Sequence, residues 1–212
     1  MTADRLLLWR HGRTASNRGD RYQGQLDVPL DDVGRVQVKD AAELLAIELG
    51  GRPFRIVSSD LSRAYETALA LATRLDAPVT TDPQLREIFV GRWQGLRRPD
   101  VAAAEPEAFA AWQAGEDVAV GGGERRSEAG ARAAAAVEAH AASLDGGVLV
   151  VASHGAALRG AVLQLLGYPQ WSPHVLGALR NAHWADLSRR GDRWVLDGYN
   201  VGPPRGAPGV EG

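Results

Sequence analysis

Two apolar runs in this chain each stop abruptly at a His-Gly pair. Residues 6–9 lead into Arg10-His11-Gly12, and residues 148–153 lead into His154-Gly155. Short runs of this kind are typical of buried parallel strands, which are apolar on both faces. The carboxyl ends of such strands meet in the crevice where open α/β sheets bind ligands. The pattern therefore predicts an α/β fold with both imidazoles in one site.

The rest of the chain alternates between the spacings of helices and strands. Apolar residues recur at helical spacing over residues 36–49, 61–75, 126–144 and 156–166. Strand patterns cover 55–58, 79–81, 182–188 and 193–199, the last two around a turn at 189–192. We expect Ser59 and Asp60 to cap the helix after strand 55–58. Together the elements predict a three-layer α/β/α sandwich, with a mostly parallel central sheet and an antiparallel edge strand.

The chain has 212 residues, a length that suits one compact domain. We expect this domain over residues 1–200, with residues 12–32 as a long loop. The stretch 91–123 breaks the pattern with Pro, Gly, Trp and mixed charge, so it predicts a partly helical lid insertion over the carboxyl edge of the sheet. Residues 201–212 are rich in Pro and Gly, and they are predicted to be a disordered tail.

Composition limits the classes of partner. The formal net charge is -2 with both signs mixed along the chain, so we expect no nucleic acid and no membrane as partner. Cysteine is absent, which excludes disulfides and thiolate zinc sites and fits a cytoplasmic location. The apolar run near the N-terminus is too short for a signal peptide or a membrane span. The oligomeric state stays open, a homodimer included.

Arg10, His11 and Thr14 mark the first candidate site. A histidine that attacks a phosphoryl group must be neutral at the attacking nitrogen, and neighbouring arginines help because they lower its pKa. Arginine also binds phosphate oxygens in a bidentate manner. A structural role would explain one isolated histidine, but the second His-Gly pair favours a shared phosphate site.

Other residues fall near the same crevice. Arg63 lies one turn into the helix that follows strand 55–58, so its guanidinium can reach the carboxyl end of the sheet. Asn17 and the Gln23-Gly24 pair lie on the long loop, where side-chain amides and backbone N–H groups could complete a cage for an oxyanion. Turn formation explains these loop residues equally well.

Glu87 is a candidate proton donor. A carboxyl group partly shielded from water under a lid can protonate a departing alkoxide near neutral pH. An ordinary surface ion pair with Arg86 is the alternative. The five histidines show no metal-binding spacing, and no acidic cluster accompanies either His-Gly pair, so we expect no metal and no cofactor.

The order of these motifs resembles the histidine phosphatase superfamily, the phosphoglycerate-mutase-like clan. The resemblance covers residues 5 to 200 and implies a phosphomonoesterase that forms a phosphohistidine. It implies that His11 accepts the phosphoryl group and that Glu87 donates the proton. The phosphate-binding residues that it implies are Arg10, Arg63 and His154, with Asn17, Gln23, Gly24, Glu87 and Gly155 lining the site. The matching motifs are Arg10-His11-Gly12 with Thr14 and Asn17, Gln23-Gly24, 31–34, Ser58-Ser59 with Arg63 and Thr67, 85–87, 91–95, 122–124 and 153–155.

Within the superfamily, the chain looks most like the glucosyl-3-phosphoglycerate phosphatases of actinobacteria. Residues 23–27, 58–67, 85–87, 91–96 and 181–184 carry this closer resemblance, which implies hydrolysis of a small phosphorylated metabolite. A broad-specificity phosphatase and a cobalamin-pathway (α-ribazole) phosphatase are alternatives, because Gln-Gly and Trp-Gln-Gly motifs also occur among them. A phosphoglycerate mutase is a further alternative, which would have to keep the phosphohistidine from water. A phosphate-binding module without catalysis is the alternative outside enzymes. Arg13 departs from the Glu or Gln of many relatives.

The lid region offers groups for a sugar-bearing substrate. Trp93 and Trp112 could pack on a sugar ring, while Arg92, Arg97 or Arg98 holds a glycerate carboxylate. Alternatively, the two tryptophans pin the lid to the sheet.

Overall fold

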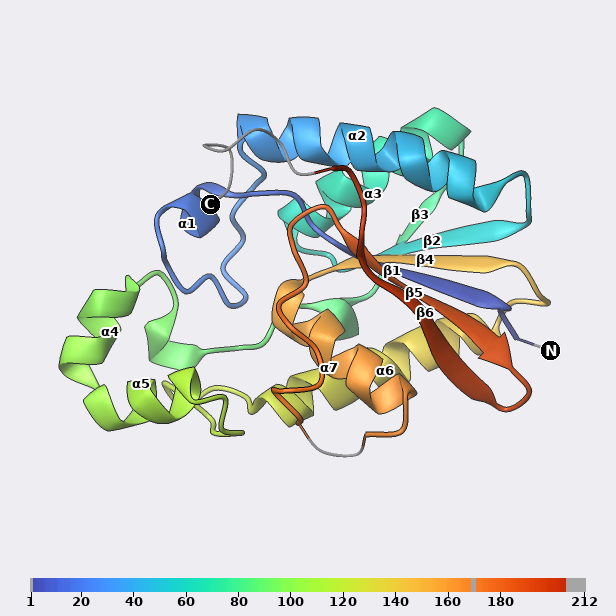
Figure 1. The fold of residues 1–212 in the computed structure, drawn as a ribbon. Coiled ribbons are helices and arrows are strands. Elements are labelled where there is room, and N and C mark those ends of the chain that lie inside the picture. Colours follow the sequence, from blue (N-terminus) through green and yellow to red (C-terminus); the bar gives the residue numbers. More distant parts are fainter. Residues whose placement is uncertain (1, 169–170, 205–212) are drawn as a thin grey trace.

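The computed structural model describes residues 2–168 and 171–204. Its core is a six-stranded sheet in the order β3-β2-β4-β1-β5-β6. Helices α2 and α3 cover one face of the sheet, and α6 and α7 cover the other (Figure 1). The strands are β1 (Arg5–Arg10), β2 (Phe54–Ser58), β3 (Val79–Thr81), β4 (Val148–Ser153), β5 (Trp184–Arg190) and β6 (Arg193–Val201). The main helices are α1 (Ala15–Arg18), α2 (Asp32–Leu49), α3 (Ser62–Leu75), α4 (Arg98–Ala104), α5 (Pro106–Gln113), α6 (Arg126–Ala142) and α7 (Gly155–Leu165).

The sheet has the predicted mixed topology. Strand β4 runs parallel to β1 and β2, and β2 runs parallel to β3. Strand β5 pairs antiparallel with β1, and β6 pairs antiparallel with β5. The predicted three-layer sandwich with an antiparallel edge strand is confirmed: β6 lies at the edge and pairs antiparallel with β5, which is the one strand of this sheet that runs opposite to β1.

Strand β1 is apolar on both faces because helices cover both faces. Leu6 and Leu8 pack into the core on the side of α6 and α7. Leu7 and Trp9 pack into the other core, formed with α2 and α3. All four side chains are fully buried, which contributes roughly 1.5–3 kcal/mol each for the aliphatic ones. This two-sided burial fixes the strand that carries His11.

The start of α3 differs from the prediction. Leu61, not Ser59 or Asp60, is the N-cap, and it makes no side-chain capping bond. The free N–H of Ser62 donates instead to Asp27 Oδ1 at 2.7 Å. Asp60 pairs with Arg86 through two bonds of 2.7 and 2.6 Å. A residue distant in sequence caps this helix because the long loop folds back over it.

The long loop and the chain end show smaller differences. Within residues 12–32, α1 forms a short helical turn capped by the Thr14 side chain. Val201 ends β6 rather than beginning a tail. The predicted disorder of 205–212 lies outside the described residues. Among the helices of the described part of the chain, none is long and apolar enough to cross a membrane.

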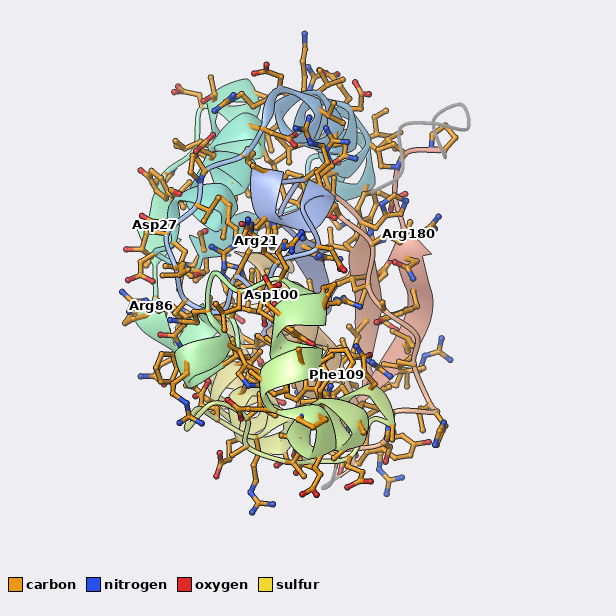
Figure 2. The ribbon with its side chains drawn as sticks, turned by 90° about the vertical axis from the view of Figure 1, so that its left-hand side faces the viewer. Arg21, Asp27, Arg86, Asp100, Phe109 and Arg180 are labelled. Carbon is orange, nitrogen blue, oxygen red and sulfur yellow. The ribbon has the colours of Figure 1, made fainter. Side chains whose placement is uncertain are left out.

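Residues 91–123 form the predicted insertion. Helices α4 and α5 lie beyond the carboxyl ends of β1, β2 and β4 (Figure 1). Figure 2 looks onto this end of the molecule, with Asp100 on α4 and Phe109 on α5 in front of the sheet. A separate apolar cluster holds the insertion in place, and Trp93 is buried in it. The Trp93 ring lies 5.1 Å from Tyr22 and 6.0 Å from Trp112 between centroids.

Candidate active site

The topology brings the two His-Gly pairs together. Strand β1 pairs with β4 so that Arg10 lies opposite Ser153. These are the last residues of the two strands, and a histidine follows each of them. The ring centroids of His11 and His154 are 5.2 Å apart. Both side chains are buried. The sequence prediction that both imidazoles reach one site is confirmed.

Hydrogen bonding fixes which nitrogen of His11 carries the proton. His11 Nδ1 lies 2.6 Å from the carbonyl oxygen of Gly12. A carbonyl only accepts hydrogen bonds, so Nδ1 carries the hydrogen and Nε2 carries the lone pair. Burial lowers the pKa of His11 well below its usual value, and the charges of Arg63 and Arg10 lower it further. The ring is therefore neutral near pH 7, and its Nε2 lone pair is available to an electrophile.

His154 has the opposite arrangement. Its Nδ1 accepts a hydrogen bond of 3.2 Å from Arg63 Nε. Its Nε2 lies 2.9 Å from Ser59 Oγ, so Nε2 carries the hydrogen. Burial lowers the pKa of His154 well below its usual value, followed by the charge of Arg63. Ser59, predicted as a helix cap, thus belongs to the site.

Arg63 and Arg10 surround the two rings with positive charge. Arg63 is fully buried and donates to the carbonyls of Gly24 and Leu26 at 2.8 Å each. Burial lowers its pKa to about 10, against the opposing charge of Glu87. Arg10 Nη1 donates to Leu179 O at 2.6 Å, while its buried Nε donates to no described residue. Neither guanidinium has a carboxylate bonded to it among the described residues, so both can attract an anion.

Glu87 lies at the N-terminus of α7. Its Oε1 accepts from the N–H groups of Ile88 and Ala157 at 2.9 and 3.0 Å, and its Oε2 accepts from Ala156 N at 3.2 Å. The N-terminus of a helix carries partial positive charge, which attracts the oxygens of this side chain. Burial lowers the pKa of Arg10, and the charge of Glu87 opposes this lowering. The alternative pair with Arg86 is not formed, since Arg86 binds Asp60.

The long loop supplies polar groups, but several of them bind other residues of the protein rather than facing an oxyanion. Asn17 Oδ1 accepts from Thr14 N at 3.1 Å and lies 3.1 Å from Thr14 Oγ1. These contacts fix the orientation of the amide. Gln23 Oε1 lies 3.0 Å from the same hydroxyl. Gly24 has a φ of 54°, and a Cβ there would lie 2.4 Å from Gln94 Oε1. Its carbonyl holds Arg63, so Gly24 positions the arginine.

Gly155 gives Arg10 room. An added Cβ at this position would lie 3.2 Å from Arg10 Nε. That approach is tighter than ordinary van der Waals contact, so a larger residue would push the guanidinium aside. The predicted site residues therefore converge at one end of the sheet, between the two helix layers.

Comparison with protein families agrees with this geometry. The model of the histidine phosphatase superfamily (branch 1) matches residues 6–202. The chain belongs to the histidine phosphatase superfamily.

Relatives in this superfamily cover nearly the whole chain. A glucosyl-3-phosphoglycerate phosphatase of Mycolicibacterium vanbaalenii is 41% identical over 95% of this chain and 96% of its own length. A metal-independent phosphoserine phosphatase of Arabidopsis thaliana is 34% identical over 92% of this chain and 80% of its own. A solved mycobacterial glucosyl-3-phosphoglycerate phosphatase in complex with VO3 superimposes with a TM-score of 0.85 at 39% identity, covering 94% of this chain and 100% of its own. The predicted phosphatase class is confirmed.

The lid of this histidine phosphatase differs from one sequence expectation. Trp93 is buried, and the guanidinium of Arg126 lies 3.4 Å above the centre of the Trp112 ring. Trp93 is therefore packed inside the lid, and Arg126 covers one face of the Trp112 ring.

The lid arginines also have partners. Arg92 pairs with Glu105 at 3.3 Å, Arg97 with Asp100 at 3.1 Å, and Arg98 with Asp20 at 2.9 Å. Within the described residues, no group of three or more His, Cys, Asp or Glu side chains could hold a metal ion.

The two buried histidines make the stability of the fold depend on pH. Both pKa values are lowered from 6.5 in the folded state, so below pH 6.5 the unfolded chain binds more protons. We expect the free energy of unfolding to be insensitive to these groups above about pH 7.5. Below pH 6 we expect it to fall by up to about 2.7 kcal/mol per pH unit, from two protons.

Denaturant titrations between pH 5 and pH 8 measure this dependence. A His11→Gln/His154→Gln variant is the matched control, because it keeps every carboxylate that also titrates. Subtracting the variant's free energy of unfolding from that of the unchanged chain isolates the contribution of the histidines. We expect this difference to decrease as the pH falls. Parallel curves would show that neither imidazole is held neutral.

Proposed function

We propose that this chain is a metal-independent phosphomonoesterase that hydrolyses glucosyl-3-phosphoglycerate through a phosphohistidine at His11. The observation that carries the chemistry is the state of the His11 ring. Its Nδ1–H is held by Gly12 O, which leaves the lone pair on Nε2. Two guanidinium groups without a bonded carboxylate among the described residues lie beside the ring. That combination suits a nucleophile facing a phosphate dianion.

In the first step, Arg10 and Arg63 hold the phosphoryl oxygens, and the Asn17 Nδ2 group assists them. His154 contributes by orienting Arg63, whose Nε donates to His154 Nδ1. His11 Nε2 attacks phosphorus as the bond to the ester oxygen breaks. Glu87 gives a proton to the departing oxygen, so the leaving group departs as a neutral alcohol. The arginines counter the charge that spreads over the phosphoryl oxygens in the transition state.

In the second step, water takes the place of the alcohol. Glu87, now ionised, removes a proton from the water as its oxygen bonds to phosphorus. The P–N bond breaks, and inorganic phosphate leaves a neutral His11. The first proton leaves with the alcohol, and Glu87 gains a new one from the water, so it ends the cycle protonated as it began.

The choice of substrate rests on the relatives. Two-fifths of the residues match the Mycolicibacterium vanbaalenii glucosyl-3-phosphoglycerate phosphatase over nearly all of both chains. The lid tryptophans give no separate support, because they pack against the protein. We also propose a cytoplasmic location, where a highly charged phosphate ester of this kind is retained by the membrane. Whether the chain forms a homodimer stays a prediction.

A substrate panel tests the proposed function. We expect kcat/KM for glucosyl-3-phosphoglycerate to exceed that for 3-phosphoglycerate by at least about 10-fold, because remote contacts help to position the ester. Phosphate release with a chelator present measures both, and p-nitrophenyl phosphate serves as a generic ester. Phosphoserine and α-ribazole phosphate test the nearest alternatives.

The outcomes of this panel are distinct. Preference for phosphoserine or α-ribazole phosphate would overturn the substrate and leave the reaction class in place. Efficient interconversion of phosphoglycerates would identify a mutase. Loss of activity with chelator would contradict a metal-independent reaction.

A further inference from the structure

Asn181 lies against the backbone that carries His11. Its Nδ2 group is 3.0 Å from His11 O, 3.2 Å from Gly12 O and 3.4 Å from Asn17 Oδ1. The following residue, Ala182, donates its N–H to both Arg10 O and His11 O at 3.1 Å. The segment before β5 thus crosses the carboxyl end of β1 and binds three successive carbonyls.

Gly12 O is shared between Asn181 and the imidazole. It accepts from His11 Nδ1 at 2.6 Å and from Asn181 Nδ2 at 3.2 Å. A carbonyl oxygen has two lone pairs, so both bonds can form together. The Asn181 amide therefore binds one lone pair of Gly12 O and leaves the other directed at the imidazole. The N–H of the same peptide, on Arg13, donates to Gln37 Oε1 at 2.9 Å, so Asn181 holds the carbonyl side of this peptide and Gln37 holds its N–H side. Without the amide, the carbonyl that accepts from Nδ1 would lose its side-chain partner.

From this geometry we infer that Asn181 is a positioning residue, which keeps His11 in the tautomer with the lone pair on Nε2 by holding the Gly12 carbonyl. This inference rests on the proposed function, in which Nε2 attacks phosphorus. The tautomer of an imidazole is set by the bond that its other nitrogen makes. Groups behind the reacting residue typically change activity by about 10–100-fold when removed.

Asn200 provides a matched control. Its Nδ2 donates to Ala178 O at 3.0 Å, and its Oδ1 accepts from Arg180 N at 2.7 Å. It therefore anchors the same segment through a side-chain amide, but its partners are not the carbonyls of His11 and Gly12. If Asn181 only stabilised the segment, Asn181→Ala and Asn200→Ala would have the same effect.

The experiment compares Asn181→Ala, Asn181→Asp and Asn200→Ala with the unchanged chain. We expect Asn181→Ala to lower kcat by about 10–100-fold while KM changes less than about 3-fold, because Arg10 and Arg63 remain. Asn181→Asp keeps the shape but turns an oxygen toward the carbonyls, so its kcat should fall at least as far. Asn200→Ala should keep kcat within about 3-fold.

Imidazole ¹⁵N spectra of the free protein read the tautomer without any turnover. His11→Asn identifies the His11 signals by their loss. We expect Nδ1–H in the unchanged chain and in Asn200→Ala, and a mixture of tautomers in Asn181→Ala. Equal kcat losses in the Asn181 and Asn200 variants, or an unchanged tautomer in both Asn181 variants, would overturn the inference. A chain that hydrolyses no ester would instead overturn the proposed function, and the spectra would still test Asn181.

Discussion

Replacing His11 by alanine is expected to lower kcat by about 10⁴-fold or more on every phosphate ester, because the variant loses the Nε2 atom that attacks phosphorus. Phosphate binding should persist in this variant. Arg10 and Arg63 keep their carbonyl partners, so inorganic phosphate should bind within about 10-fold of its original affinity.

His140→Asn is the matched control for this variant. His140 pairs with Asp82 at 2.9 Å through Nε2, away from the two site histidines. We expect the kcat of the His140→Asn variant to be unchanged. Phosphate release and phosphate titration by calorimetry give the two measurements. Substantial turnover in His11→Ala, or loss of phosphate binding together with turnover, would remove the nucleophile assignment.

Glu87→Gln should separate substrates by their leaving groups. A sugar or glycerate alkoxide needs a proton to depart, whereas nitrophenolate departs readily without one. We expect a loss of roughly 10²–10⁴-fold in kcat with the alkyl ester and a much smaller loss with p-nitrophenyl phosphate. The glutamine side chain would keep one oxygen to accept from the N–H groups at the start of α7.

The comparison of two substrates on one variant controls for any change in folding. A misplaced helix or a disturbed phosphate site would reduce both rates equally. Equal losses on the two esters would therefore remove the general-acid assignment, even if the variant is nearly inactive.

Sequence predicted the parts of the site that strands carry. A strand buried on both faces has a fixed direction, so the residues after it have a fixed position, and His11 and His154 meet as expected. Arg63 was also found by its place one turn into the helix after strand 55–58, whereas Glu87 was found from the need for a proton donor near the lid and from the family resemblance. These signals are local, and hydrophobic periodicity records them.

Contacts between distant segments could not be predicted in this way. Asp27 caps α3 across 35 residues, and the amide of Asn181 reaches Gly12 across 169 residues. Neither contact leaves a periodic signal. The lid tryptophans were ambiguous for a similar reason, because the same side chain can pack on a ligand or on Arg126, and only the fold decides between them.

The stereochemical course at phosphorus tests the phosphohistidine reaction most directly. Each in-line transfer inverts the configuration of a phosphoryl group, so transfer to His11 and then to water involves two inversions. The substrate for this test is an ester whose phosphoryl group is chiral through ¹⁶O, ¹⁷O and ¹⁸O. An added alcohol accepts this group in place of water, and ³¹P spectroscopy of the new ester reports its configuration. Net retention is the predicted result. Net inversion would contradict the phosphohistidine pathway, because it requires a single transfer with no intermediate on the protein.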